Sequence, residues 1–303
     1  MKVALSIALA LVLLAGSSPR AADDASKSTE EWRAKRATEL QGPDNWLTVA
    51  GLFFLKPGAN SIGTHPDSDI VLPAGSAPEH SGQVTYQNGK VWLELRPGVD
   101  ATAGDKPIAG RYQIASRTPA GAPAPRVASG RIGLQLHQSG ERTGIRLRDP
   151  ESALRRQFAG LRWYPVDAAY RITGKLIRYD QPKQIVGQNI LGDVTTSTSP
   201  GEIEFRVNGQ VVRLIATTAG KGLSFVFRDA TAGTDTYRIR FLSADAPAAN
   251  GDVVLDFNRA YNPPCAFNPH TTCPIPPPQN RLTIPIAAGE KLYLASASTT
   301  TSR

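Results

Sequence analysis

Apolar side chains occupy every second position through much of this chain, as in segments 223–227 and 237–241. A period of two places such side chains on one face of a β-strand. The chain is also punctuated by 27 glycines and 24 prolines. We therefore expect a mainly β protein, built as antiparallel β-sandwich or barrel-like sheets with one short N-terminal helix. The pattern predicts strands at 132–137, 170–179, 223–228, 237–242, 253–257 and 291–295.

Two Asn-Gly pairs, Asn88-Gly89 and Asn208-Gly209, predict β-hairpins. Asn-Gly is the preferred composition of a two-residue type I′ turn, and the turn fixes the register of its strands. On the outer face of the second hairpin, Glu204 should oppose Arg213 as an ion pair. The predicted apolar pairs are Tyr86 with Val91, Val84 with Leu93, Phe205 with Val212 and Ile203 with Leu214.

One segment has the pattern of a helix. Residues 28–31 read Ser-Thr-Glu-Glu, which is a capping box, and Trp32, Ala37 and Leu40 follow on one side before Gly42-Pro43. Later, a run at 118–125 rich in proline and alanine predicts a linker or exposed loop. We therefore divide the chain into a signal peptide (1–22), a helix with an N-terminal β unit (23–120) and a C-terminal β domain (121–303).

The first residues have the composition of an export signal. Lys2 is followed by an apolar run at 4–15, which is too short to span a bilayer. Cleavage after Ser17 has small residues at the required positions, whereas cleavage near Ala22 would place Arg20 at position −3. We expect a periplasmic or secreted protein that does not span the membrane after processing.

The charge distribution limits the choice of partner. The formal net charge is +8, but the basic residues are scattered and do not alternate with aromatic residues. This distribution does not predict binding to nucleic acid. It is compatible with an anionic component of the cell envelope.

The only two cysteines, Cys265 and Cys273, lie eight positions apart in a proline-bound loop. In an oxidising compartment this spacing favours a disulfide. The alternative is a copper or zinc site that also uses His270, but no spacing indicates a second histidine, and the initiator is the only methionine. We therefore predict no metal and no cofactor.

The chain resembles DUF1684, a bacterial and archaeal family without an assigned function. The resemblance is carried by Asp256-Phe-Asn-Arg-Ala-Tyr-Asn-Pro-Pro-Cys265, by 273–282 and 288–291, and by the earlier blocks 46–52, 158–165 and 227–237. A departure occurs at Arg238-Ile-Arg-Phe241, where members more often have a glycine-containing stretch. Because the family has no assigned activity, the resemblance implies no chemistry.

Residues 61–89 are also similar to a forkhead-associated sandwich. The similar elements are Ile62-Gly63, the stretch 69–73, His80 and the Asn-Gly turn. Thr64, however, stands where that family has the arginine that contacts phosphate. The similarity therefore indicates β-sandwich topology and does not predict phosphothreonine recognition.

The polar residues around the cysteine loop are the candidate site. Arginine forks suit carboxylates and phosphates, so the loop could bind an anionic small molecule or envelope component. Alternatively, the same side chains could satisfy carbonyls that a proline-rich backbone leaves unpaired. The predicted ligand-binding residues are Asn258, Arg259, Tyr261, Asn262, Asn280 and Arg281.

Two further functions remain open. One is a hydrolase or lyase with Asp256 as acid or base, assisted by Asp229 or His137, although the nucleophile-elbow, zincin and nucleotide-binding motifs are absent from the sequence. For Asp229 an ordinary turn with Thr231 is the simpler interpretation. The other function is a non-catalytic envelope assembly module, which should expose a large apolar patch.

Overall fold

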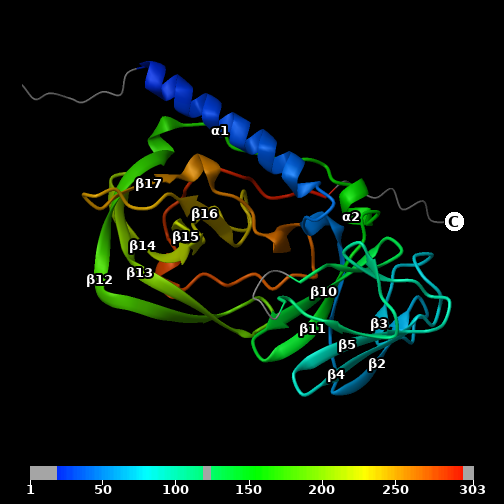
Figure 1. Cartoon of the computed structure of the whole chain (residues 1–303). Coiled ribbons are helices and arrows are strands. Elements are labelled where there is room, and N and C mark those ends of the chain that lie inside the picture. Colours follow the sequence, from blue (N-terminus) through cyan, green and yellow to red (C-terminus); the bar gives the residue numbers. More distant parts are fainter. Residues whose placement is uncertain (1–18, 119–123, 296–303) are drawn as a thin grey trace, which may run out of the picture.

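Three β-sheets account for most of the regular structure in the computed structural model, which describes residues 19–118 and 124–295. Figure 1 shows one long helix, α1 (Pro19–Leu40), lying beside the C-terminal sheet. The predicted mainly β fold class is therefore confirmed. Residues 1–18 of the predicted signal peptide lie outside the described residues. No helix in the described part is long and apolar enough to cross a bilayer.

The N-terminal part contains two sheets that enclose one apolar core. The five-stranded sheet has the order β3-β2-β4-β5-β8 and the six-stranded sheet the order β1-β11-β10-β9-β6-β7. Inward side chains such as Val84 and Leu93 from the first sheet pack with Ile132, Ile145 and Leu147 from the second. The strands are β1 (Val49–Phe54), β2 (Gly58–Gly63), β3 (Ile70–Val71), β4 (Gly82–Gln87), β5 (Lys90–Leu95), β6 (Thr102–Ala103), β7 (Lys106–Pro107), β8 (Arg111–Ile114), β9 (Val127–Ser129), β10 (Ile132–Ser139) and β11 (Arg142–Arg148).

The six-stranded sheet joins residues from both sides of the predicted boundary at 120/121. Strand β1 pairs with β11, and β6 pairs with β9. The first β unit therefore extends over residues 49–148, and the run at 118–125 connects strands within this unit. The middle of that run, 119–123, lies outside the described residues.

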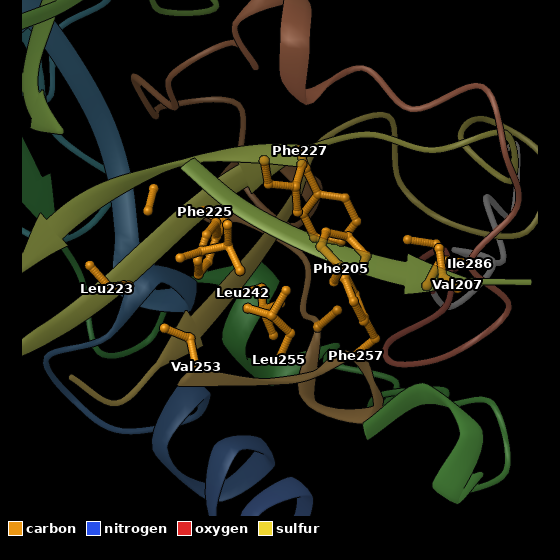
Figure 2. Close-up of a cluster of buried hydrophobic side chains, with 14 of the residues drawn as sticks. Phe205, Val207, Leu223, Phe225, Phe227, Leu242, Val253, Leu255, Phe257 and Ile286 are labelled. Atoms are coloured by element: carbon orange, nitrogen blue, oxygen red, sulfur yellow. The ribbon is translucent and has the colours of Figure 1, made fainter. Parts of the chain in front are cut away.

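The C-terminal part forms one curved sheet with the order β16-β15-β14-β13-β12-β17. Its concave face holds a core rich in phenylalanine, in which Phe257 contacts Phe205 and Phe227 at ring-centroid distances of 5.5 and 5.7 Å (Figure 2). The strands are β12 (Arg171–Gln188), β13 (Val194–Val207), β14 (Gln210–Ala219), β15 (Gly222–Phe227), β16 (Arg240–Ala244) and β17 (Asp252–Asp256). A short helix, α2 (Ala153–Arg156), precedes them.

Both predicted hairpins are confirmed, residue by residue. Asn88, Gly89, Asn208 and Gly209 all have positive φ angles, as a type I′ turn requires. The predicted ion pair joins Arg213 Nη2 to a Glu204 carboxylate oxygen at 2.7 Å. The structure contains all four predicted apolar pairs, Tyr86–Val91, Val84–Leu93, Phe205–Val212 and Ile203–Leu214.

The predicted helix exists, but it begins at Pro19 instead of at the capping box. Ser28 therefore lies within α1, where its hydroxyl accepts a hydrogen bond from Arg259 Nη2 at 2.7 Å. The helix extends upstream because proline is tolerated in a first helical turn and alanine has a high helix propensity. The buried Arg33 of α1 donates to the carbonyl oxygens of Tyr164 and Asn258, which fixes the helix against the C-terminal unit.

Two of the predicted strands differ from the structure. The strand predicted at 237–242 begins only at Arg240, because residues 229–236 form a tight turn cluster stabilised by side-chain hydrogen bonds. Residues 291–295, predicted as a strand, contain no strand. After β17 the described chain is irregular apart from three short 3-10 helices, η3 (Phe257–Arg259), η4 (Pro264–Ala266) and η5 (Pro278–Asn280). Eight of the 24 prolines of the chain lie here, and proline cannot donate a ladder hydrogen bond.

The hairpin of β12 and β13 extends beyond its own sheet and reaches the N-terminal unit. At its tip, Asp193 accepts hydrogen bonds from Ser139 Oγ at 2.6 Å and from both Nε and Nη2 of Arg142. We call the irregular chain after β17, residues 257–295, the proline-rich segment. It lies along the same ribbon, since Ile190 N donates to the Cys273 carbonyl. Two separate cores are thus tied together by this ribbon and by the irregular segment.

Candidate functional site

The three candidate asparagines are buried and bind the backbone of neighbouring segments. Asn258 Oδ1 accepts from Asp167 N at 2.9 Å, and its Nδ2 donates to the Asp167 carbonyl at 2.8 Å. Asn262 Nδ2 donates to Glu290 and to the Lys291 carbonyl. These amides therefore act as clamps for irregular backbone, which has no ladder of its own.

Asn280 has the same function at η5. Its Oδ1 accepts from Ile215 N at 2.7 Å, and its Nδ2 donates to the carbonyls of Ile215 and Val226, both at 3.0 Å. Asn268, which was not among the predicted residues, clamps the N-terminal unit by donating to the carbonyls of Trp46 and Val49. Asn280 and Asn268 thus hold the proline-rich segment on the C-terminal and N-terminal β units.

Asp256, Arg259 and Tyr261 line a groove of about 730 Å³ beside α1. Asp256 Oδ1 accepts from the backbone and the side chain of Asn258, and its Oδ2 lies 3.5 Å from Arg259 Nε. The guanidinium of Arg36 lies 4.4 Å from the ring centroid of Tyr261. Because both oxygens of Asp256 are hydrogen-bonded or ion-paired within the protein, its environment is that of a structural cap on η3.

Asp229 and His137, the other catalytic candidates, lie in different environments. Asp229 is fully buried and accepts from Arg240 Nη1 at 2.7 Å. His137 lies on β10 in the N-terminal unit, where burial, followed by the charge of Arg146, lowers its pKa to about 4. The structure therefore does not bring these two residues into the groove that Asp256 lines.

Arg281 belongs to a different cavity, which two unpredicted arginines share with it. Asn280 holds η5 on β14 and β15, and Arg281 follows it directly, in a parallel bridge with Arg228 at the end of β15. Arg238, on the segment before β16, completes the set. The cavity has a volume of about 240 Å³, and its lining consists of the three arginines, Ile190, Ile239, Ile275 and Pro276.

The positive charge of this cavity is not neutralised by the described protein. Across residues 19–118 and 124–295, none of the three arginines forms an ion pair with a carboxylate. Arg281 Nε donates to the Pro276 carbonyl at 3.1 Å, which orients its guanidinium and leaves both Nη atoms available. Three guanidinium groups around an apolar floor form a site suited to an anion.

The two cysteines lie next to each other as thiols. Cys265 N donates to Cys273 Sγ at 3.3 Å, and Cys273 is buried while Cys265 is half-buried. Cys273 also lies 3.9 Å from Thr271 Oγ1. Within the described ranges, no three His, Cys, Asp or Glu side chains converge in a way that could hold a metal ion.

Of the three arginines in the cavity, only Arg281 was among the predicted ligand-binding residues. Arg228 precedes Asp229 in a block quoted for the family resemblance, and Arg238 opens the stretch that departs from the family pattern. That departure was the available signal, because it introduces a charge where members more often carry glycine. Without the fold, nothing indicated that residues 228, 238 and 281 meet.

Comparisons with known proteins support an assignment to a family. Residues 156–291 match the family described as "Protein of unknown function (DUF1684)". No curated protein matches the chain. The chain is similar to the solution NMR structure of an uncharacterized protein from gene locus rrnAC0354 of Haloarcula marismortui, with 28% identity and a TM-score of 0.38, covering 45% of this chain and 78% of that one.

A second similarity is to the FhaA FHA domain complexed with the intracellular domain of Rv3910. It has 16% identity and a TM-score of 0.22, and it covers 32% of this chain and 97% of that chain. The family match spans the C-terminal sheet and most of the proline-rich segment. Over residues 156–291, the chain therefore resembles the DUF1684 family.

Proposed function

We propose that this protein is exported and binds a small anion in the cavity formed by Arg228, Arg238 and Arg281, which we call the arginine pocket. The observation that supports the proposal most directly is that one cavity is lined by three arginines that form no ion pair with a carboxylate of the described residues. Like charges held together repel one another, and a bound anion relieves this repulsion. The pocket uses the predicted loop through Arg281, and Arg259 remains a predicted ligand-binding residue of the separate groove.

The size and lining of the pocket limit the ligand. A volume of about 240 Å³ is smaller than the roughly 300–1,000 Å³ of sites for drug-sized molecules. The three guanidiniums offer bidentate contacts to a carboxylate or phosphate, and Ile239 and Ile275 offer apolar contact. A phosphate or carboxylate carried on a short apolar group fits this combination.

Export adds a second expectation, a disulfide between Cys265 and Cys273. The adjacency of the two side chains supports it, and an oxidising compartment would favour it. The bridge would close a short loop directly before the segment that carries Arg281. Mass spectrometry of the exported protein under non-reducing conditions tests both the cleavage site and the bridge.

Calorimetric titration with phenyl phosphate and with inorganic phosphate tests the pocket. Arg281→Ala should weaken binding of phenyl phosphate at least tenfold, because it removes the guanidinium that the Pro276 carbonyl orients. Arg206→Ala is the matched control, since Arg206 is exposed on the same sheet and forms no part of the pocket. An equal loss of affinity in both variants would mean that only general charge attraction is involved.

A further inference from the structure

A buried arginine without an acidic partner lies close to the cysteines. Arg146, on β11, is only 6% exposed, and no carboxylate among the described residues pairs with it. Its guanidinium lies 5.0 Å from the ring centroid of Trp46, and its Nε has no hydrogen-bond partner in the described chain. Burial lowers its pKa to about 10. A buried cation costs free energy unless an anion compensates for it.

The side chains around Arg146 indicate which anion this is. Its Nη2 lies 3.3 Å from His137 Nε2, which also lies 3.3 Å from Thr272 Oγ1, so Arg146 is held next to the residue before Cys273. Arg146 interacts electrostatically with Cys273. A thiolate on Cys273 is thus the anion that this segment can supply to Arg146, and His137 adds no second positive charge beside it because it is neutral above a pKa of about 4.

The surroundings of Cys273 stabilise such a thiolate further. The hydrogen bond from the Cys265 side chain lowers the pKa of Cys273 most, and burial opposes it. The Cys265 backbone N–H, Thr271 and the charge of Arg146 lower the pKa further, so the net shift is downward. The same contact, together with burial, raises the pKa of Cys265. The two sulfurs are therefore unequal, with the negative charge favoured on the buried one.

We propose that Cys265 and Cys273 form a thiol–disulfide exchange site for a dithiol partner, in which Arg146 stabilises Cys273 as the leaving thiolate. The half-buried Cys265 is the more accessible sulfur of the pair. Exchange is faster and more favourable when the leaving thiolate is stabilised. The bridge predicted from the sequence is then a reducible bond instead of a permanent cross-link.

The exchange proceeds in two steps. One thiolate of the dithiol attacks Cys265 Sγ, a mixed disulfide forms, and the Cys265–Cys273 bond breaks with its electron pair retained on Cys273 Sγ beside Arg146. The second thiolate of the dithiol then attacks the partner sulfur of the mixed disulfide, which releases Cys265 as a thiolate that takes up a proton from solvent. The dithiol is oxidised to a disulfide and the cysteine pair is reduced.

Equilibration with mixtures of reduced and oxidised dithiothreitol, followed by alkylation and mass spectrometry, tests this proposal. Arg146→Met should shift the equilibrium at least tenfold toward the disulfide, which corresponds to about 30 mV for a two-electron couple. Arg146→Lys should restore part of the shift because it retains the charge. Arg148→Met is the matched control, since Arg148 lies on the same strand, 6.0 Å from the same Trp46 ring, and should leave the equilibrium unchanged.

An unchanged equilibrium in Arg146→Met would overturn the proposal, and so would a wild-type pair that forms no disulfide with oxidised dithiothreitol. A second measurement does not depend on the folding of that variant. In Cys265→Ser, the rate at which iodoacetamide alkylates Cys273 should rise with a midpoint below pH 8.5, the approximate pKa of an unperturbed cysteine. A midpoint at or above that value would also overturn it. The arginine pocket plays no part in either measurement.

Discussion

The buried ion pair between Arg240 and Asp229 allows a quantitative test of how the proline-rich segment is held. Both side chains are 0% exposed. Arg240 also donates to the carbonyls of Ile286 and Ala288, and Asp229 accepts from the backbone N–H of Ile286 at 3.2 Å. The pair therefore fixes the end of the irregular segment to the C-terminal sheet. Substitution of Arg240 by methionine keeps a side chain of similar length and removes the charge.

The expected cost follows from the burial of the remaining partner. Arg240→Met leaves the Asp229 carboxylate in the protein interior without its counter-ion, and breaking a buried pair in this way costs about 3–5 kcal/mol of the free energy of unfolding. Asp229→Asn should have a cost in the same range, because it leaves the guanidinium unpaired. The double variant should cost less than the sum of the two, by about 1–3 kcal/mol, since neither charge is then left alone.

Urea unfolding followed by tryptophan fluorescence measures these values. The surface pair Glu204–Arg213 provides the matched control, because its nitrogen–oxygen distance is also 2.7 Å but its side chains are 38% and 51% exposed. Arg213→Met should therefore cost less than about 1 kcal/mol. If Arg240→Met proved no more destabilising than Arg213→Met, or if the two buried substitutions simply added, the reasoning from burial would be refuted.

Two other predictions concern contacts between segments. Gly289→Ala should destabilise the protein more than Gly233→Ala. Both glycines have φ near +85°, which costs alanine about 1–2 kcal/mol, but a Cβ at Gly289 would also lie 2.5 Å from the Ala260 carbonyl oxygen, whereas the space at Gly233 is open. Equal losses of melting temperature in the two variants would contradict this. Hydrogen bonds from Arg142 lower the pKa of Asp193 to about 2, so the contribution of Asp193 to stability should be complete above about pH 4 and should disappear as the pH falls toward 2. The melting temperatures of wild type and Asp193→Asn should therefore differ at pH 6 and converge near pH 2. A difference that stays constant with pH would refute this pKa assignment.

The parts of the fold that could be predicted are those that local chemistry determines. The Asn208-Gly209 turn fixes the register of its strands without reference to the rest of the chain, and the alternation of apolar residues then selects the buried face. The prediction of a strand at 291–295 was wrong, because β-propensity alone does not provide a neighbouring strand to pair with. The start of α1 was missed because the proline and alanines upstream of the capping box are themselves compatible with a helix.

The candidate site was predictable only as a region. The predicted loop contributes Arg281 to a cavity, but the sequence does not show which polar side chains form hydrogen bonds with the backbone. Asn258 and Asn280 form hydrogen bonds with the backbone, because an amide side chain has both donors and an acceptor and can pair with a backbone N–H and a carbonyl at once. Arg228 and Arg238 were not predicted as site residues, because they lie outside the loop and are brought to the cavity only by the tertiary fold.

This difference between amides and guanidiniums explains how one irregular segment can support both proposed sites. A guanidinium has donors and no acceptor, so it cannot replace Asn280 as a clamp. An arginine whose guanidinium is not used by backbone carbonyls still requires an anion. Asn280 places Arg281 beside Arg228, and Asn268 fixes the loop that carries the cysteines against the strands of the N-terminal unit. The ligand chemistry of both proposed sites therefore depends on the amides that hold the backbone in place. Loss of the Asn280 clamp should weaken anion binding without changing the reactivity of Cys273. Loss of the Asn268 clamp should change the reactivity of Cys273 without weakening anion binding.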